Sequence, residues 1–365
     1  MDKLINQLKI STPGRVCLFG EHQDYLQLPV VAAAISLRIS ITGSRRDDKI
    51  ININLPNISL KESFNIVEPI VYTEERDYFK SSFKVLIRNS FTFSSGFDCI
   101  VDGKIPINAG TSSSSALIVT WINFLTRMSD QSVLLSPEHL ARYAYEAEVL
   151  EFSEPGGMMD HYSTSFGGII SIDFFPKTVV TKLEAKLKAF VLGNSHQPKD
   201  TKHILSNVKD RILFIEIKLK NVDSKFSIQD ISFNELSQFK NNLSDSEFIL
   251  LEGTIKNRDI TRIARTTLNK KDIDHKLIGT LLNDHQKVLR DVLGISTPKI
   301  DEMIEAALNA GAYGAKINGS GGGGCMFAYA PENPRQVYEA ISKISDEVYI
   351  IYPDEGTREE AFENV

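Results

Sequence analysis

The chain has 365 residues, more than the roughly 250 to 300 at which one hydrophobic core stops growing, so its length predicts two domains. Its composition, 42% hydrophobic and 24% charged residues, is that of an ordinary folded protein and excludes collagen, coiled coil and extended disorder. The net charge is −6 without any block of like charges, so the sequence offers no footprint for a nucleic-acid backbone or an anionic membrane.

The cysteines and the first residues indicate the compartment. Cys17, Cys99 and Cys325 lie far apart without a CxxC pair, which fits neither a disulfide framework nor a zinc site. The N-terminal sequence lacks the apolar segment of a signal peptide, and no apolar run approaches the ~18 residues of a membrane span. We therefore expect a soluble, cytoplasmic protein with reduced thiols and no membrane partner.

Strands are expected first along the chain, and a helix follows them. Residues 50–60 alternate apolar and polar side chains, and residues 28–42 are rich in Val and Ile, so the first third is predicted to be mostly strand. Behind a run of serines, apolar residues recur at helical spacing, which predicts a helix over 113–128.

A domain boundary is expected near residue 180. Segments 166–175 and 188–195 look like strands, and the lysine-containing stretch between them separates a domain of residues 1–180 from one of residues 181–365. The second half is then predicted to contain helical segments over 233–293, a helix opened by Thr297-Pro298 and closed near Gly311, and a strand-like end at 348–353.

A loop of small residues, Ile105–Leu117 (IPINAGTSSSSAL), leads into the predicted helix over 113–128. Backbone N–H groups in such a loop can converge on an anion, and the helix dipole adds to the attraction, so the loop could hold phosphate. It is not a GxxxxGK[ST] loop, because no lysine follows the glycine. The other interpretation is a serine-rich capped turn.

A glycine-rich stretch, Gly319–Gly324 (GSGGGG), interrupts two strand-like segments. Glycine in such a place indicates that the backbone approaches something closely. That partner is either a ligand or, if the stretch is a tight turn or bulge, another part of the chain.

Polar residues gather around an apolar strand in Gly14–Tyr25 (GRVCLFGEHQDY), where they are Arg15, Glu21, His22 and Asp24. Carboxylates and an imidazole can exchange hydrogen bonds with the hydroxyls of a sugar, and an arginine can meet the charge of a phosphate. This pattern predicts a site for a polyhydroxyl ligand, with a surface turn that carries a salt bridge as the alternative.

A second predicted helix starts at Ser136-Pro137 and runs toward the stop signal Pro155-Gly156-Gly157. Its last turn carries Glu148, which could hold a magnesium ion, because this hard cation takes one or two carboxylates plus phosphate oxygens. Asp160 follows the stop signal and could accept or orient a hydroxyl proton during phosphoryl transfer. The alternative for Asp160 is an Asx cap.

Together and in this order, the motifs PGRVCLFGEHQDY, PINAGTSSSSAL, EPGGMMDH and GAYGAKINGSGGGGC resemble those of the GHMP small-molecule kinases. This family includes galactokinase, homoserine kinase, mevalonate kinase and phosphomevalonate kinase. The first motif is similar to the galactokinase form GRVNLIGEHTDYN, and the stretch NDHQKVLRDVLGISTPKIDEMIEAA also resembles galactokinase. The resemblance implies an α/β (α+β) fold of two domains, a ribosomal-protein-S5-like N-terminal domain and a ferredoxin-like C-terminal domain, with the site between them.

The resemblance also implies roles for individual residues and a need for ATP and Mg²⁺. Arg15 and Asp160 would be catalytic, Asp160 as base or hydroxyl-orienting group. Glu21, His22, Asp24 and Gly157 would contact the sugar. Glu148 and Ser114 would hold magnesium. The nucleotide phosphates would be bound by Asn108, Ala109, Gly110, Thr111, Ser112, Ser113, Ser114 and Ser115, supported by Gly321 and Gly322.

The resulting expectation is an ATP-dependent kinase that phosphorylates the anomeric hydroxyl of a monosaccharide, most simply galactose to galactose 1-phosphate. Its partners would be the sugar and ATP, and the chain would act as a monomer or weak homodimer. The segment after Gly193-Asn194-Ser195 (HQPKDTKHILSNVKDR) lacks the family's arginine-rich stretch with a sugar-contacting tyrosine. Three alternatives therefore stay open: a kinase for another sugar or a uronic acid, a mevalonate-type kinase, and a non-catalytic sugar and ATP sensor.

Overall fold

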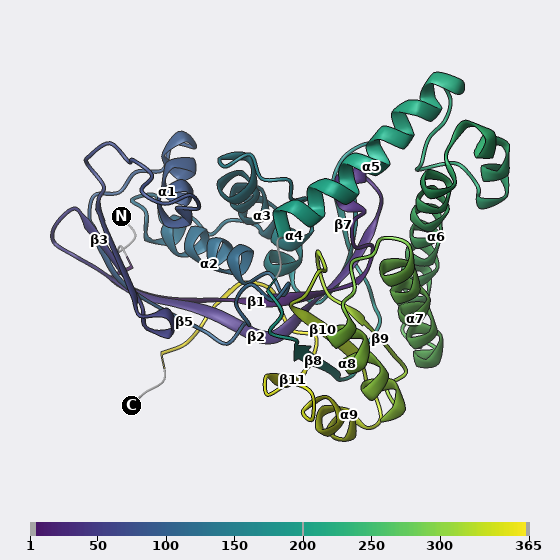
Figure 1. Ribbon diagram of the computed structural model, residues 1–365. Helices are drawn as coiled ribbons and strands as arrows, with labels where there is room; N and C mark the ends of the chain where they lie inside the picture. The colour runs from purple at the N-terminus through teal and green to yellow at the C-terminus, as the bar shows by residue number, and fades with distance from the viewer. Residues whose placement is uncertain (1–4, 199–200, 363–365) are drawn as a thin grey trace.

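The fold is built on two β-sheets with helices packed against them (Figure 1). The structure is a computed structural model that describes residues 5–198 and 201–362, with the backbone alone for residues 201–206. In this part of the chain, one sheet has eight strands and the other has four. The mixed α/β class expected from the sequence is confirmed.

The larger sheet is formed mostly by the first half of the chain. Its strands run in the order β12-β1-β2-β5-β3-β4, and β6 pairs with both β2 and β7. The central pair, β1 and β2, is antiparallel, with irregular register after Pro13 and after Cys17. The strand bounds are β1 Gln7–Phe19, β2 Val30–Arg45, β3 Ile50–Leu55, β4 Leu60–Asn65, β5 Phe97–Gly103, β6 Ile169–Asp173, β7 Val179–Lys182 and β12 Arg358–Glu359.

Helices cover the larger sheet on the face that looks upward in Figure 1. The predicted helix over 113–128 is confirmed as α2, and it packs on β1 and β2 through an apolar face in which Trp121 stacks on Phe124. Ser136 caps the next helix as predicted, because its hydroxyl accepts from the His139 N–H (3.3 Å). The helix bounds are α1 Tyr78–Arg88, α2 Ser113–Met128, α3 Pro137–Tyr145 and α4 Met159–Phe166.

The smaller sheet is antiparallel, in the order β11-β8-β10-β9, and α8 and α9 pack on it while α7 packs against β9. Its strands are β8 Phe190–Asn194, β9 Gly314–Ile317, β10 Cys325–Tyr329 and β11 Val348–Ile351. The helices of this half are α5 Thr201–Val222, α6 Asp245–Leu268, α7 His275–Asp291, α8 Pro298–Asn309 and α9 Pro334–Ile341. Short 3₁₀ segments are η1 Asp24–Leu26, η2 Pro56–Ile58 and η4 Phe233–Asn242.

Three elements differ from the sequence prediction. The first third also contains α1, an amphipathic helix that buries Phe79 and Phe83. The segment after Ser195 contains α5, although residues 199–200 of that segment lie outside the described residues. The helix predicted from Ser136-Pro137 to the glycine stop is α-helical only to residue 145, where it widens into the π turn η3 (Glu146–Leu150).

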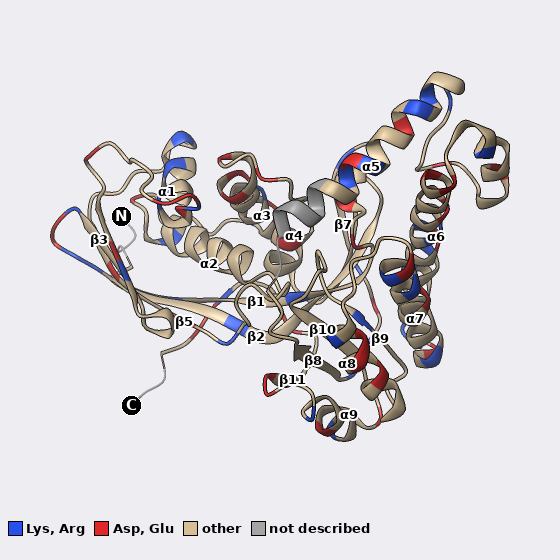
Figure 2. Ribbon diagram, viewed as in Figure 1, with Lys and Arg blue, Asp and Glu red and all other residues tan. Residues whose placement is uncertain are grey.

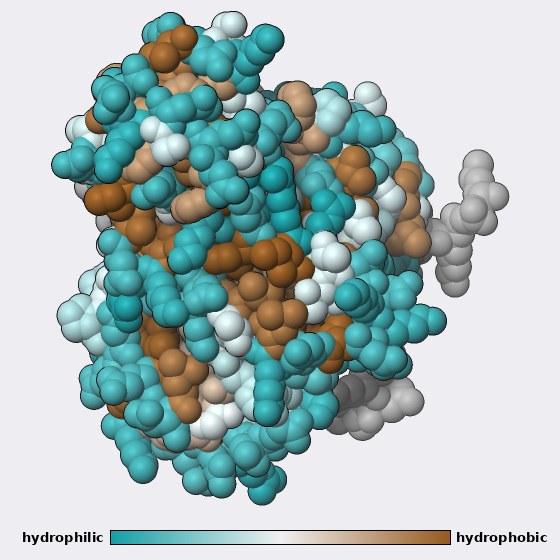
Figure 3. Space-filling view, turned by 90° about the vertical axis from the view of Figure 1, so that its right-hand side faces the viewer, coloured by the Kyte–Doolittle hydropathy of each residue, from teal (hydrophilic) through white to brown (hydrophobic). Residues whose placement is uncertain are grey.

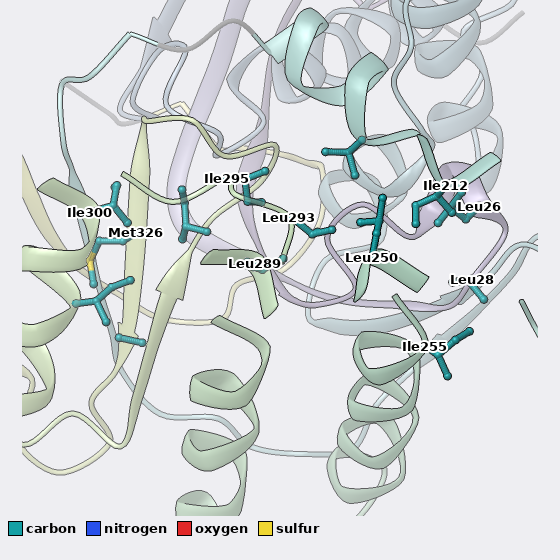
Figure 4. Close-up of a cluster of buried hydrophobic side chains, with 14 of the residues drawn as sticks. Leu26, Leu28, Ile212, Leu250, Ile255, Leu289, Leu293, Ile295, Ile300 and Met326 are labelled. Carbon is teal, nitrogen blue, oxygen red and sulfur yellow. The ribbon is translucent and has the colours of Figure 1, made fainter. Parts of the chain in front are cut away.

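The two halves of the chain are interleaved. The C-terminal strand β12 pairs with β1 in the larger sheet. In the other direction, Leu26 and Leu28 lie in the apolar core of the second half, together with Ile212 of α5 and Leu250 of α6 (Figure 4). The segment that follows β1 is therefore fixed to the second half by apolar burial. The division into residues 1–180 and 181–365 stays a prediction.

The surface carries charges of both signs. Figure 2 shows Lys and Arg interspersed with Asp and Glu along α5, α6 and α7. The face turned to the viewer in Figure 3 also has apolar patches, and the large exposed apolar residues of α5 and α6 include Phe214, Ile217, Ile249 and Ile263. Among the described helices, none is long and apolar enough to cross a bilayer. The cytoplasmic location and the monomer or weak homodimer stay predictions.

Candidate active site

A cavity lies where the end of β1, the start of α2, the π turn and the start of α4 meet the segment after β9. It brings together residues that are far apart in the sequence. The sequence-predicted residues that line it are Arg15, Glu21, His22, Asp24, Asn108, Gly110, Ser112, Ser113, Ser114, Ser115, Glu148, Gly157 and Asp160. Four others, Ala109, Thr111, Gly321 and Gly322, are not part of the lining.

Arg15 and Asp160 form an ion pair in the lining of the cavity. Arg15 is buried on β1, and its Nε and Nη2 atoms donate to Asp160 Oδ1 at 2.9 and 2.6 Å. Its Nη1 donates to the Gly110 carbonyl at 2.5 Å. Burial alone would raise the pKa of Asp160, but the charge of Arg15 holds it below the ordinary value. Asp160 is therefore ionised. It lies beside the loop of residues 108–115 that leads into α2, which is called the phosphate-type loop.

The loop before α2 has the backbone shape of an anion cradle. Asn108, Gly110 and Ser112 have φ values of 55°, 82° and 61°, and the first amides of α2 have no intrahelical partner. Ala109 and Thr111 are buried, and their carbonyls accept from Cys325 N–H and Arg15 N–H at 2.8 and 3.1 Å. These two residues therefore hold the loop in place through β10 and β1, while their neighbours line the cavity.

Glycines after β9 let the backbone approach this loop. A β-carbon on Gly319 would lie 2.9 Å from the Gly110 carbonyl oxygen, and one on Gly324 would lie 2.7 Å from that of Ala109. Gly321 and Gly322 instead contact Ile295, whose carbonyl accepts from the Gly322 N–H at 2.7 Å. The close partner of this glycine-rich stretch is thus the chain itself, at the phosphate-type loop and at residue 295.

Glu148 lies on the π turn, a local widening of a helix that often occurs at functional sites. Its Oε2 accepts from Ser115 Oγ and from His161 Nε2, both at 2.7 Å. Burial would raise the pKa of Glu148, but the hydrogen bond and charge of His161 hold it below the ordinary value. The residue is therefore an ionised carboxylate next to the serines at the start of α2.

Asp24 and Gly157 touch. A β-carbon on Gly157 would lie 1.8 Å from Asp24 Oδ2, so any larger residue there would have to displace the Asp24 carboxylate. Asp24 Oδ1 accepts from the Tyr25 N–H at 2.9 Å. Burial, with a smaller contribution from the charge of Asp160, raises the pKa of Asp24 to about 6. Unlike Asp160, Asp24 forms no ion pair with an arginine or lysine of the described residues.

Glu21 and His22, which precede Asp24 in the sequence, are buried and contact other parts of the chain. Glu21 is 1% exposed and forms an ion pair with Lys316 of β9. His22 is also buried, and its two ring nitrogens bond to the Tyr25 hydroxyl (2.8 Å) and to the Ser320 carbonyl (2.9 Å). Burial lowers the pKa of His22 to about 4, so its ring is neutral. His22 thus uses both ring nitrogens within the chain, whereas Glu21 Oε2 is buried without a hydrogen-bond partner among the described residues.

Sequence reasoning missed part of the lining, including Arg76, Tyr78 and Glu154. Arg76 precedes α1 and Glu154 follows the π turn, and the two form paired hydrogen bonds of 3.1 Å. Nothing in the spacing of these residues connects them, because the fold alone brings them together. His161 also lines the cavity, where it contacts Glu148.

Three family models match the chain. They are the galactokinase galactose-binding signature over residues 6–45, the GHMP kinases N terminal domain over residues 77–168 and the GHMP kinases C terminal model over residues 264–347. Together they span more than half of the sequence. The cavity residues of β1, of the α2 loop with α4, and of the glycine-rich stretch fall in the first, second and third match respectively.

Known proteins are similar over nearly the whole chain. A mevalonate kinase of Thermococcus sibiricus is 29% identical over 342 residues, which cover 91% of each chain. A galactokinase of Actinobacillus succinogenes is 26% identical and covers 96% of this chain and 94% of its own. Among solved structures, Lactococcus lactis galactokinase in complex with galactose has a TM-score of 0.84 at 20% identity, and the match covers 96% of this chain and 95% of the other. That last similarity concerns the fold.

Proposed function

The chain belongs to the GHMP kinase family, and we propose that it transfers a phosphoryl group from ATP to the anomeric hydroxyl of a monosaccharide, most simply galactose. The observation that carries the proposal is the Arg15–Asp160 ion pair, which lies between the amide-lined loop before α2 and the carboxylate of Asp24. One side of this pair suits phosphate, and the other suits hydroxyl groups.

Phosphoryl transfer depends mainly on positioning and on neutralising charge. Arg15 is held by Asp160 and by the Gly110 carbonyl, so its guanidinium is oriented before any ligand binds. The proposed role of Arg15 is to stabilise the transferring group, while the loop amides hold the nucleotide phosphates. Because Arg15 lowers the pKa of Asp160, Asp160 is a weak base, and this favours orienting the hydroxyl over early removal of its proton.

The donor set beside the loop fits magnesium. Glu148 is an ionised carboxylate whose Oε2 is used by Ser115 and His161, and Ser114 lines the same part of the cavity. The ion would take its other ligands from phosphate oxygens and water. Mg²⁺ held by Glu148 and Ser114 would offset the charge of the phosphate oxygens.

A neutral polyol fits the substrate side of the cavity better than a carboxylic acid. Among the described lining residues, the arginine and lysine side chains are Arg15, paired with Asp160, and Arg76, paired with Glu154. A substrate carboxylate would also face the unpaired Asp24. The match to the galactokinase galactose-binding signature supports a sugar. The similarity to mevalonate kinases supports the second candidate, phosphorylation of mevalonate.

The test is ATP consumption with Mg²⁺ across galactose, glucose, mannose, arabinose, glucuronate, galacturonate, a heptose and mevalonate, with Asp160→Ala as the blank. We expect turnover on a neutral sugar that is absent from the blank. Turnover on mevalonate alone would replace the sugar with the second candidate. Ligand binding by thermal shift without turnover on any substrate would contradict the kinase proposal and support a sensor.

A further inference from the structure

Glu148 uses one of its two carboxylate oxygens inside the protein. Its Oε2 accepts hydrogen bonds from Ser115 Oγ on α2 and from His161 Nε2 on α4, both at 2.7 Å. A carboxylate oxygen has about two lone-pair directions, so these two donors occupy Oε2. The oxygen that Glu148 can offer to the proposed magnesium ion is therefore Oε1.

His161 is buried, and Glu148 is its polar partner. The ring of Tyr145, the last residue of α3, packs against the His161 ring edge to face, with centroids 5.5 Å apart. Because the ionised Glu148 carboxylate can only accept, His161 Nε2 carries the hydrogen of their bond. The other ring nitrogen, Nδ1, is buried without a hydrogen-bond partner among the described residues. Burying such a nitrogen costs stability, so packing alone does not explain a histidine here.

The backbone that carries Glu148 is held by a different helix. In an α-helix the Glu151 N–H would bond to the Ala147 carbonyl, but in the π turn it bonds to the Glu146 carbonyl at 3.0 Å. The Ala147 carbonyl accepts instead from Ser81 Oγ of α1 at 2.9 Å, and both residues are buried. The main chain at Glu148 is thus fixed from α1, whereas the side chain of Glu148 is oriented from α2 and α4.

The first turn of α4 carries two neighbouring residues that contact different parts of the site. Asp160 accepts from Arg15, and the next residue, His161, donates to Glu148. The helix α4 itself packs on α2 and α3, which lie on either side of the π turn in the sequence or carry the serines beside it. One turn of helix therefore carries both the residue proposed to orient the hydroxyl and the residue that contacts the proposed metal ligand.

We propose that His161 is a positioning residue for the metal ligand: its bond to Oε2 fixes the Glu148 carboxylate so that Oε1 is presented to the ion. This inference rests on the proposed function, in which Glu148 binds magnesium, and it adds a residue that touches neither the substrate nor the ion. Without the His161 donor, the carboxylate would be free to rotate. Removing a hydrogen-bond partner of a metal ligand typically lowers metal affinity by about 10- to 100-fold.

The experiment measures metal binding without turnover. Calorimetry gives the Kd of ADP in EDTA and in MgCl₂, and the ratio of the two values reports how much the ion adds to nucleotide affinity. His161→Leu should lower this ratio by about tenfold and leave the Kd in EDTA unchanged. His161→Gln keeps an N–H donor near the position of Nε2, so its ratio should stay within about threefold of wild type. His161→Asn is polar but too short to reach Glu148, so it should behave like His161→Leu.

Two controls separate positioning from a general loss of structure. Ser163→Ala removes a buried hydrogen bond of the same helix, from Ser163 Oγ to the Met159 carbonyl (2.6 Å), and should leave the ratio unchanged. In a Glu148→Gln background, His161→Leu should change the ratio no further, because His161 acts through that carboxylate.

Three results would overturn the inference. They are a wild-type ratio of one, a His161→Leu ratio equal to that of wild type, and an ADP Kd that rises as much in EDTA as in MgCl₂. If the ratio falls in His161→Leu as expected while the wild type turns over no substrate of the panel, the proposed function fails and the positioning of Glu148 stands.

Discussion

Gly157 and Asp24 are in contact, with room for a hydrogen but not for a carbon between them. A β-carbon added to Gly157 would lie 1.8 Å from Asp24 Oδ2 and 2.2 Å from Asp24 Cγ. The two residues come from separate motifs, one after β1 and one before α4. Their contact sets how close the turn of residues 20–28, which carries Asp24, comes to Asp160, three residues after Gly157.

Gly157→Ala should weaken sugar binding, because the new methyl group must displace the Asp24 carboxylate. We expect sugar KM to rise by at least about tenfold with a smaller change in ATP KM, since a misplaced contact of this size is costly. Gly156→Ala is the matched control, because a β-carbon there meets only Val149 Cγ2, at an ordinary 3.7 Å. Equal sugar KM values for the two variants would show that the contact has no role in binding.

Asp160→Asn should lower kcat by about a hundredfold or more, because it removes the charge that holds Arg15 and the acceptor proposed to orient the hydroxyl. The free energy of unfolding should change little in comparison. Asp354→Asn is the control, since Asp354 also pairs with an arginine, Arg38, at 3.0 Å but outside the cavity. Turnover within a few-fold of wild type would remove Asp160 from the reaction.

Glu148→Gln should raise the magnesium concentration needed for half-maximal activity, because a neutral amide binds this cation less well than a carboxylate. A titration of activity with MgCl₂ at saturating ATP measures the change. Glu151→Gln provides the comparison, since Glu151 lies just after the same π turn but pairs with Arg88 at 2.6 Å. If the two magnesium titrations coincide, Glu148 is not a ligand of the ion.

Local patterns in the sequence predicted the elements that carry the site. The serine run with apolar residues at helical spacing predicted α2 to the residue, and Ser136-Pro137 predicted the start of α3. The helix α5 also has such a pattern, with Val208, Ile212, Ile215 and Leu219 buried on one face, so this element could have been found. The π turn could not, because it depends on how Glu148 meets α2 and α4 rather than on spacing along the chain.

The roles of some cavity residues depend on contact partners that are distant in the sequence. Sequence reasoning could not separate these roles. Glu21 and Asp24 look alike in the motif GEHQDY and both line the cavity, yet Glu21 pairs with Lys316 of β9 while Asp24 forms no ion pair among the described residues. Likewise, the spacing of Arg76 and Glu154 gives no hint that they form an ion pair. The residue types of the cavity were predictable, whereas the pairing that assigns each one required the fold.

The raised pKa of Asp24 predicts how the free energy of unfolding varies with pH. Its pKa is raised from 3.8 to about 6 in the folded protein, so the folded state binds this proton more tightly than the unfolded state. The stabilisation from the neutral carboxyl is fully present below pH 3.8 and is lost as pH rises through about 6. Asp24→Asn, which stays neutral, should therefore be more stable than wild type at pH 8 by about 3 kcal/mol, and the difference should shrink toward pH 4.

Urea unfolding of both proteins at pH 4.5, 6 and 8 measures this difference, because the other titrating groups are common to both. Sugar binding should show the opposite dependence, since the ionised carboxylate is the better acceptor. The wild-type kcat/KM for sugar should fall below about pH 6. A stability difference that does not vary with pH would place the pKa of Asp24 at its ordinary value.

Asn318 should prove important for the nucleotide side of the cavity, because its side chain connects β1 to the loop before α2. It is fully buried after β9, where its Oδ1 accepts from Cys17 N–H (2.9 Å) and its Nδ2 donates to the Gly110 carbonyl (2.8 Å). The Gly110 carbonyl also receives Arg15 Nη1, so one oxygen joins β1, the phosphate-type loop and the glycine-rich stretch. Asn318→Leu removes both hydrogen bonds at similar side-chain volume and leaves the Cys17 N–H buried without an acceptor.

We expect Asn318→Leu to lower the free energy of unfolding by about 1 to 3 kcal/mol, the usual range for an unsatisfied buried group. ATP KM should rise more than sugar KM, because the change loosens the loop at Gly110 while the Glu21–Lys316 pair remains. Asn123→Leu is the control for lost stability, since Asn123 is a buried residue of α2 whose amide donates to Thr357 (3.0 Å) away from the cavity. Titrations of activity with ATP, under conditions in which both variants are equally folded, measure the ATP KM of each. The same ATP KM in both would mean that Asn318 has a purely structural role.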